Sequence, residues 1–205
     1  MTDFGDCIEA LWPNCPAPLK TGIVNNSADI LAKMDFNTTL RVAHFGAQIS
    51  HESDGGVITH ESLNYSHASR IAAVWPSRFT EESAEAYVHD EHKLADKVYN
   101  GRMGNVAGTD DGFNFRGRGL LQITGRDSYT EAANALGIDL TNNPDLAIDP
   151  DYSLLVAAWE FKKLGCLPHC DDDDVRAVTR LVNGGYIGLA EREQWLARWK
   201  RHLGI

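Results

Sequence analysis

The chain has 205 residues, of which 43% are hydrophobic, and its formal net charge is -10. This size is typical of one domain with a sizeable core, so we expect a single domain over residues 1–205, acting as a monomer. The negative charge excludes the basic surface of a nucleic-acid-binding protein and disfavours attraction to anionic membranes. No apolar run in the sequence is long enough to span a bilayer, so we expect no membrane insertion.

The amino-terminal residues Met1 to Asp6 lack the basic segment and the apolar stretch of a secretory signal. We therefore expect synthesis in the cytoplasm without a signal peptide. The four cysteines are compatible with two local disulfides or with four reduced thiols. A zinc site is disfavoured, since the spacing of Cys166 and Cys170 beside His169 matches zinc-binding patterns only loosely. We expect neither a metal nor a cofactor.

The segment from Thr38 to Ser50 predicts a mostly buried helix, because apolar residues dominate it and it contains no proline. Glu52 falls at the carboxyl end of this helix, where the negative pole of the helix dipole disfavours a charged carboxylate. This position favours the protonated form that a general acid needs. His51, the preceding residue, could orient or stabilise Glu52.

Glu61 is the second candidate carboxylate. The pair Gly55-Gly56 permits a tight turn, so that Glu61 can come back across a cleft from Glu52. Hydrolysis of a glycosidic bond uses two carboxyl groups in this way, one as an acid and one to activate water. Taken singly, Glu52 equally fits a residue that merely ends a helix, and Glu61 a solvated loop charge.

The middle of the chain predicts a smaller, inserted helical lobe over about residues 66–100, with a helical pattern from Ser83 to Tyr99. The following glycine-rich segment contains Arg116 and Arg118, whose guanidinium groups could lie near the carboxylates. Arg118 is equally compatible with keeping Glu61 ionised and with a structural ion pair that holds the loop.

Gln122 and Thr124 alternate with apolar residues, which predicts a short strand near residues 120–124 with one polar face. Two neutral hydrogen-bonding groups on one face suit a sugar or a water molecule. At such positions, however, these residue types also commonly satisfy nearby backbone groups.

The remaining sequence is helical in pattern over residues 128–136, 152–164, 175–182 and 189–203. The acidic run from Asp171 to Asp174 should cap the helix that follows it, because acids stabilise a helix start. The fold class is therefore mainly α, with at most a short β element.

Several motifs between Thr38 and Trp195, covering about three quarters of the chain, resemble those of glycoside hydrolase family 19. The segment His51-Glu52-Ser53-Asp54-Gly55-Gly56 is similar to the family's segment that carries the catalytic acid. The run from Arg116 to Thr124 resembles its core of substrate- and water-binding residues. Asn183-Gly184-Gly185 and Arg192 resemble its late sugar-binding residues.

Three segments are more similar to the phage-lysin branch of this family: Glu61 to Ser66, Arg102 to Asn105, and Gly112 to Gln122. The resemblance implies a lysozyme-like fold of two helical lobes with a substrate cleft, and an inverting mechanism with Glu52 as acid and Glu61 as base. Together with the aromatic side chain of Tyr65, which suits a sugar face, it gives the candidate substrate-binding residues His51, Tyr65, Arg118, Gln122, Thr124, Asn183 and Arg192.

The expected activity is therefore hydrolysis of β-1,4 bonds in the peptidoglycan glycan, with release to the cell wall by a holin-type route. A chitinase acting on polymers of N-acetylglucosamine is the alternative, since the same carboxylates would serve it. An inactive glycan-binding protein on the same fold is a third possibility, which the presence of both Glu52 and Glu61 disfavours.

Overall fold

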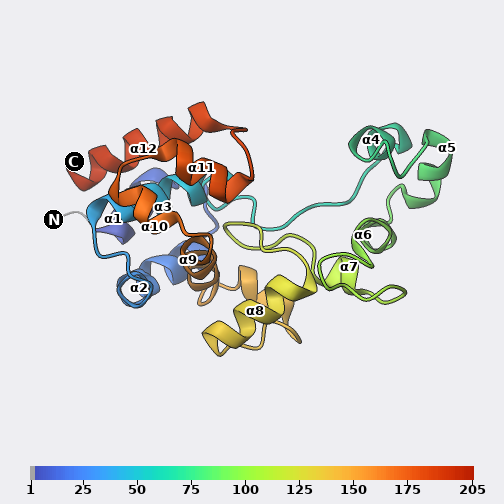
Figure 1. Cartoon of the computed structure of the whole chain (residues 1–205), viewed down its shortest axis with the longest axis horizontal. Helices are drawn as coiled ribbons and strands as arrows, with labels where there is room; N and C mark the ends of the chain where they lie inside the picture. The colour runs from blue at the N-terminus through green and yellow to red at the C-terminus, as the bar shows by residue number, and fades with distance from the viewer. Residues whose placement is uncertain (1–2) are drawn as a thin grey trace.

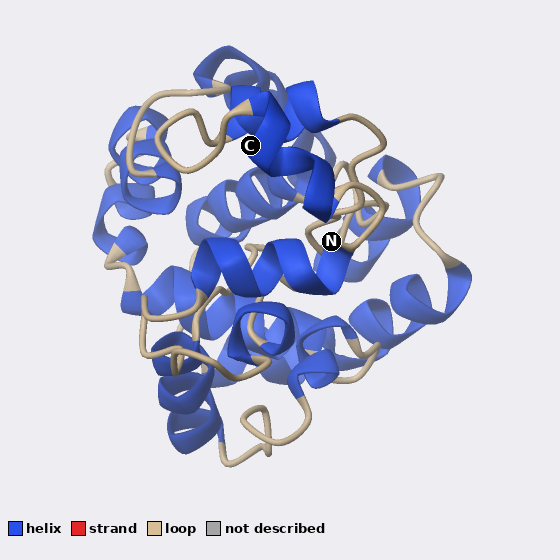
Figure 2. Cartoon of the chain, turned by 90° about the vertical axis from the view of Figure 1, so that its right-hand side faces the viewer, coloured by secondary structure: helices blue, strands red, loops and turns tan. Residues whose placement is uncertain are grey.

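The computed structural model describes residues 3–205, which form a mainly helical molecule (Figure 1). Within these residues the only β-pairing consists of isolated bridges, and the side view contains helices and loops without a strand (Figure 2). The prediction of a mainly α fold is confirmed. The helices are α1 (Phe4–Leu11), α2 (Ala17–Lys33), α3 (Thr39–Glu52), α4 (Ala68–Val74), α5 (Glu81–Ala84), η1 (Glu85–Tyr87), α6 (Glu91–Tyr99), α7 (Asp111–Asn114), α8 (Arg126–Leu136), η2 (Pro144–Ile148), α9 (Ser153–Lys163), α10 (Cys166–Asp171), α11 (Val175–Asn183) and α12 (Leu189–Leu203).

Helix α3, the predicted buried helix, runs through the main core. Its start is capped by Thr38, whose hydroxyl accepts a hydrogen bond from the backbone N–H of Arg41 at 3.2 Å. All residues from Ala43 to Ser50 are buried. The main core packs α1, α2, α3 and α9 to α12 around its aromatic residues, and Phe45 contacts Phe36 and Phe161 with ring centroids 4.7 and 5.3 Å apart.

Helix α12 lies directly against α3 because Gly46 leaves room for Trp199. A Cβ atom on Gly46 would lie only 2.4 Å from the indole of Trp199, so a larger residue would push the helices apart. The buried hydroxyl of Ser50 accepts hydrogen bonds from the indole N–H groups of Trp12 and Trp199, at 2.8 and 2.9 Å. These contacts fix the end of α3, where Glu52 stands.

Helices α4 to α7 gather at the opposite end of the long axis from the main core (Figure 1). They have their own hydrophobic cluster, which includes Leu63, Ile71, Phe79, Leu94 and Val98. A third cluster lies between α8, η2 and α9 and is centred on Phe115 and Tyr129. The chain passes between the two ends through residues 53–67 and 115–125, and the first of these segments carries Glu61.

Two predicted elements were wrong. The helix expected over residues 83–99 is interrupted, because His89 has a φ of 59° and Asp90 caps a new helix by accepting from the N–H of Lys93 at 3.0 Å. The strand expected over residues 120–124 is a turn, because Gly119 and Gln122 have φ values of 86° and 59°. Only Ile123 forms a bridge, with Arg118.

All four cysteines are buried free thiols. Burial raises the pKa of Cys7 to about 11 and that of Cys166 to about 12, which keeps them protonated and unreactive at neutral pH. Among residues 3–205, the structure has no helix with the length and apolar character that crossing a membrane requires.

Candidate active site

Glu52 stands at the last position of α3 and is held by Arg192 of α12. The side chain of Glu52 is 22% exposed, whereas the guanidinium of Arg192 is buried and donates through Nη2 to Oε1 of Glu52 and through Nη1 to Gln48. Gln48 in turn donates to the hydroxyl of Thr179 at 3.3 Å. The second carboxyl oxygen of Glu52 has no protein partner within residues 3–205, so it is available to a substrate.

The surroundings of Glu52 act on its charge in opposite directions. The end of α3 disfavours a negative charge, and the guanidinium of Arg192 favours it. Arg192 was predicted to bind substrate or else to be an exposed helical charge. The structure shows it 1% exposed and paired with Glu52, so it is placed to orient this carboxyl group.

His51 packs against the loop that joins α11 to α12. A Cβ atom on Gly188 would lie 2.4 Å from Nε2 of His51, so the ring lies directly on the backbone of this loop. Burial, and secondarily the charge of Arg192, lowers the pKa of His51, which favours the neutral ring. Asn183, at the other end of this loop, has no described contact with Glu52 or Glu61, so its substrate-binding role stays a prediction.

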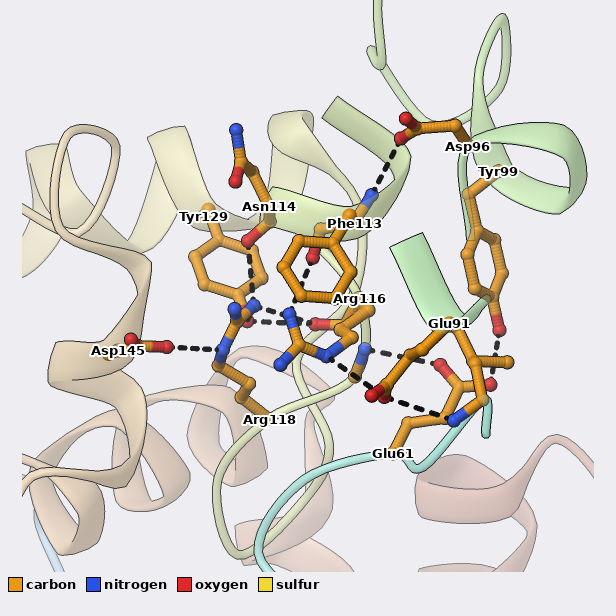
Figure 3. A network of polar contacts seen from close by, with 12 residues as sticks. Glu61, Glu91, Asp96, Tyr99, Phe113, Asn114, Arg116, Arg118, Tyr129 and Asp145 are labelled. Carbon is orange, nitrogen blue, oxygen red and sulfur yellow. Dashed lines mark hydrogen bonds and ion pairs between the residues drawn. The ribbon is translucent and has the colours of Figure 1, made fainter. Parts of the chain in front are cut away.

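Glu61 is oriented by two donors from different segments (Figure 3). The hydroxyl of Tyr99 donates to Oε1 of Glu61 at 2.7 Å, and the backbone N–H of Gly117 donates to Oε2 at 3.4 Å. The backbone N–H of Glu61 donates back to the carbonyl oxygen of Gly117 at 2.8 Å. Burial, and then this hydrogen bond, raises the pKa of Tyr99 well above its usual value, so its hydroxyl remains a donor.

Gln122 and Thr124 meet Glu61 around Gly117. A Cβ atom on Gly117 would lie 2.8 Å from Oε1 of Gln122, 3.4 Å from the hydroxyl of Thr124 and 3.5 Å from Cβ of Glu61. One amide N–H of Gln122 and the hydroxyl of Thr124 donate to backbone carbonyl oxygens, at 2.9 and 2.8 Å. Both side chains therefore present acceptor oxygens beside Glu61, which suits a water molecule that donates its protons.

Arg118 forms the structural ion pair that was one of its two predicted roles. Its side chain is buried, and its Nε lies 2.8 Å from a carboxyl oxygen of Asp145 (Figure 3). Its Nη1 donates to the carbonyl oxygen of Asn114 at 2.6 Å. No described contact joins Arg118 to Glu61, so in this structure the guanidinium holds the loop.

Tyr65 is half-buried in the cluster of α4 to α6, where its ring meets that of Trp75 edge-on at 5.7 Å. Burial raises the pKa of Tyr65, and the charge of Glu61 adds to this effect, so the two groups are electrostatic neighbours. This placement is compatible with the predicted contact between Tyr65 and a substrate.

The segment from Arg102 to Asn105 supports Tyr99. The buried amide of Asn105 donates to the carbonyl oxygen of Tyr99 at 3.1 Å and accepts from the N–H of Arg126 at 2.8 Å. Arg126 forms a bidentate ion pair with Asp111. The motif therefore ties the end of α6 to the start of α8, which fixes the position of the Tyr99 hydroxyl.

The hydrogen bond from Tyr99 to Glu61 was not predicted from the sequence. We predict that its removal in Tyr99→Phe lowers kcat at least about tenfold. Loss of a hydrogen bond to a charged group costs roughly 1.5–3 kcal/mol, and each 1.4 kcal/mol is a factor of about ten in rate. Steady-state hydrolysis of a soluble oligosaccharide gives the measurement. Tyr87→Phe is the matched control, because Tyr87 packs in the same cluster without a described hydroxyl partner. Unchanged kcat in Tyr99→Phe would contradict the role of Tyr99.

Glu160, a half-buried residue of the largely apolar helix α9, was not predicted from the sequence as a group of interest. One of its oxygens, Oε2, is buried without a hydrogen-bond partner. Burial raises the pKa of Glu160 to about 7, and the charge of Glu52 adds to the rise, while Lys163 opposes it. A lone acid among apolar residues of a predicted helix was the available signal.

Glu160 should make the folded state less stable as pH rises. Between the ordinary glutamate pKa of 4.5 and the folded value of about 7, the folded protein binds a proton that the unfolded chain has lost. The free energy of unfolding therefore falls between pH 4.5 and about pH 7, by at most roughly 3 kcal/mol. We predict that Glu160→Gln removes this loss, measured by urea unfolding at pH 4.5 and at about pH 8. Glu193→Gln, at an exposed position, is the control, and equal pH dependence in both variants would refute the prediction.

One group with ligand spacing for a metal ion occurs within residues 3–205, formed by His92, Asp96 and Asp110. The two ring nitrogens of His92 face different carboxylates, at 3.3 Å from Asp96 and 3.7 Å from Asp110. The imidazole thus bridges two acids, an arrangement that a surface ion pair explains. It touches neither Glu52 nor Glu61.

Comparison with known proteins matches residues 28–173 to the family Glyco_hydro_19, described as "Chitinase class I". A "glycosyl hydrolase family 19 domain-containing protein" of Haemophilus influenzae is 36% identical over 157 residues, which are 75% of each chain. An acidic 27 kDa endochitinase of Solanum lycopersicum is 43% identical over 67 residues, but these span only 27% of that protein.

Solved structures with the same fold include chitinase C from Streptomyces griseus, with a TM-score of 0.66 at 18% identity. That comparison covers 97% of this chain and 90% of the other. A class IV chitinase from Zea mays matches with a TM-score of 0.56 at 18% identity, covering 95% of this chain and 84% of the other. The overall fold of this chain is thus similar to that of these chitinases.

Proposed function

Because the chain belongs to glycoside hydrolase family 19, we propose that it cleaves β-1,4 bonds of the peptidoglycan glycan in the manner of a phage endolysin. The proposal rests on the observation that different residues hold the two candidate catalytic carboxyl groups. Glu52 is held by Arg192 with one oxygen free, and Glu61 is held by Tyr99 and Gly117. Two carboxyl groups held differently suit the two roles of glycoside hydrolysis.

In the proposed mechanism, the free oxygen of Glu52 protonates the glycosidic oxygen as the bond to the anomeric carbon breaks. A water molecule donates hydrogen bonds to Glu61 and to the hydroxyl of Thr124, and Glu61 takes its proton as the water attacks from the opposite face. Both carboxyl groups regain their starting protonation by exchange with solvent. This sequence gives a product of inverted anomeric configuration.

Mass spectrometry of the reducing ends released from purified peptidoglycan tests the substrate and the linkage together. We predict reducing ends produced by β-1,4 hydrolysis, and NMR of the first product should show the inverted anomer. Initial product with retained configuration would refute the water-attack mechanism. Release of peptide fragments without new sugar reducing ends would refute glycan hydrolysis.

A chitinase is the second candidate, favoured by the chitinases among the similar proteins. The motifs from Glu61 to Ser66 and from Arg102 to Asn105 support the lysin instead, because they resemble the lysin branch. Clearing of a peptidoglycan suspension and release of sugar from colloidal chitin, measured at equal enzyme concentrations, separate the two. Faster release from chitin with no clearing of peptidoglycan would replace the first proposal by the second. Access to the wall by a holin-type pore, with the protein acting as a monomer, belongs to the lysin proposal.

A further inference from the structure

A small cavity of about 230 Å³ lies beside the carboxyl end of α3. Its walls come from residues 11–14 at the end of α1, from the turn after α3, and from one face of α12. None of its lining residues is among the predicted site residues, and none contacts Glu61 in the described structure. The residues lining it are Leu11, Trp12, Pro13, Asn14, Asp54, Gly55, Trp195 and Arg198.

Four polar side chains of this cavity have no hydrogen-bond or ion-pair partner within residues 3–205: Asn14, Asp54, Trp195 and Arg198. The contrast with their neighbours is informative. The indole N–H groups of Trp12 and Trp199 both donate to Ser50, whereas that of Trp195 has no acceptor among the described residues. The cavity therefore presents an amide, a carboxylate, an indole N–H and a guanidinium that remain free to bind a ligand.

Arg198 and Asp54 carry opposite charges and both line the cavity, but they do not form an ion pair with each other. The guanidinium of Arg198 lies over the ring of Trp195, 4.9 Å from its centroid.

The backbone after α3 shapes one wall of the cavity. Asp54, Gly55 and Gly56 have φ values of 48°, 63° and 83°, so three successive residues adopt the left-handed conformation. This turn stacks Gly55 on Trp12, because a Cβ atom on Gly55 would lie 3.4 Å from the indole. Asp54 is thereby held at the rim by a rigid turn two residues from Glu52 in sequence.

The chemistry of the cavity fits a sugar ring. Sugar hydroxyl groups both donate to carboxylates and accept from guanidinium, amide and indole N–H groups, while their C–H faces contact aromatic surface. The volume lies below the roughly 300–1,000 Å³ of sites for larger ligands, so it suits one ring.

We propose that this cavity is a second glycan-binding site. It holds one N-acetylhexosamine residue of the polymer, outside the site of hydrolysis. The identity of the polymer rests on the proposed function.

The double variant Asn14→Ala/Arg198→Ala tests the site, since both positions are exposed and their loss should leave the fold intact. Arg201→Ala is the matched control, an exposed arginine of the same helix outside the cavity. Binding to peptidoglycan sacculi and to colloidal chitin is measured in a Glu52→Gln background, which separates binding from cleavage. We expect the double variant to bind about tenfold more weakly and the control to bind unchanged.

Two further measurements locate the effect. With active enzyme, the double variant should cleave a soluble glycan fragment of peptidoglycan at the normal rate but the insoluble polymer several times more slowly. In NMR titrations with the trimer of N-acetylglucosamine, the indole N–H signal of Trp195 should shift. Equal binding of double variant and control to both polymers, or a Trp195 signal that does not move, would overturn the proposal. If the enzyme cleaves chitin but not peptidoglycan, the proposed substrate fails, and the cavity is then judged on its binding to chitin.

Discussion

Replacement of Glu52 by glutamine should lower glycan hydrolysis by about 100- to 10,000-fold, the usual contribution of a general acid. The amide cannot protonate the glycosidic oxygen, but its carbonyl oxygen can still accept from Nη2 of Arg192, which now bonds to the carboxylate. We therefore expect binding of the polymer to be retained. Hydrolysis of sacculi and sedimentation of the protein with them give the two measurements.

A substrate with an acidic aryl leaving group separates loss of the acid from loss of the fold. Such a leaving group needs no protonation, so Glu52→Gln should cleave the aryl glycoside at a rate close to that of the wild type. Glu193→Gln, at an exposed position of α12, serves as the control on both substrates. More than half of the wild-type hydrolysis of natural glycan by Glu52→Gln would exclude Glu52 as the acid.

The part of the site built on long, regular helices could be predicted from the sequence. The apolar pattern over residues 38–50 predicted α3, and Glu52 ends this helix as expected. Asp174 caps α11 as predicted, accepting from the N–H of Ala177 at 2.9 Å. Arg192 lies in a charged stretch of the sequence. However, it is four and seven residues before Leu196 and Trp199, and this helical spacing places it on the buried face of α12 with them.

Contacts between distant loops could not be predicted, because no local pattern encodes them. Arg118 pairs with Asp145, 27 residues later, and its own neighbours gave no reason to prefer this acid over Glu61. Gln122 adopts a φ of 59°, although its alternation with apolar residues was typical of a strand. Here tertiary contacts around Gly117 override the local pattern.

Some site groups were visible in the sequence but carried no specific signal. Tyr99 is one of several aromatic residues near the site in sequence, most of which core packing explains more simply, and its hydrogen bond to Glu61 distinguishes it. The cavity at Trp195 joins three segments that are far apart in the chain, so its polar residues had no common pattern. Function at such positions depends on spatial convergence, which sequence periodicity does not report.

Replacement of Glu61 by alanine should also lower hydrolysis by about 100- to 10,000-fold, because no group would remain to take the proton of the attacking water. Azide distinguishes this loss from that of the acid. It attacks the anomeric carbon without needing a base, so added azide should restore turnover of Glu61→Ala and form a glycosyl azide of inverted configuration. The same azide should not restore cleavage of natural glycan by Glu52→Gln, where the leaving oxygen still lacks a proton.

Glu61→Ala and Glu52→Gln should respond differently to azide because the two sites are separate. Truncation at Glu61 opens space beside Gly117 and leaves the contacts of Arg192 and α3 unchanged. The acceptor oxygens of Gln122 and Thr124 stay in place, because one amide N–H of Gln122 and the hydroxyl of Thr124 donate to backbone carbonyl oxygens at 2.9 and 2.8 Å. Glu85→Ala, at an exposed position of η1, is the control and should respond to azide no more than the wild type does. If azide failed to raise turnover of a folded Glu61→Ala protein, or gave a product of retained configuration, Glu61 would not be the base of an inverting enzyme.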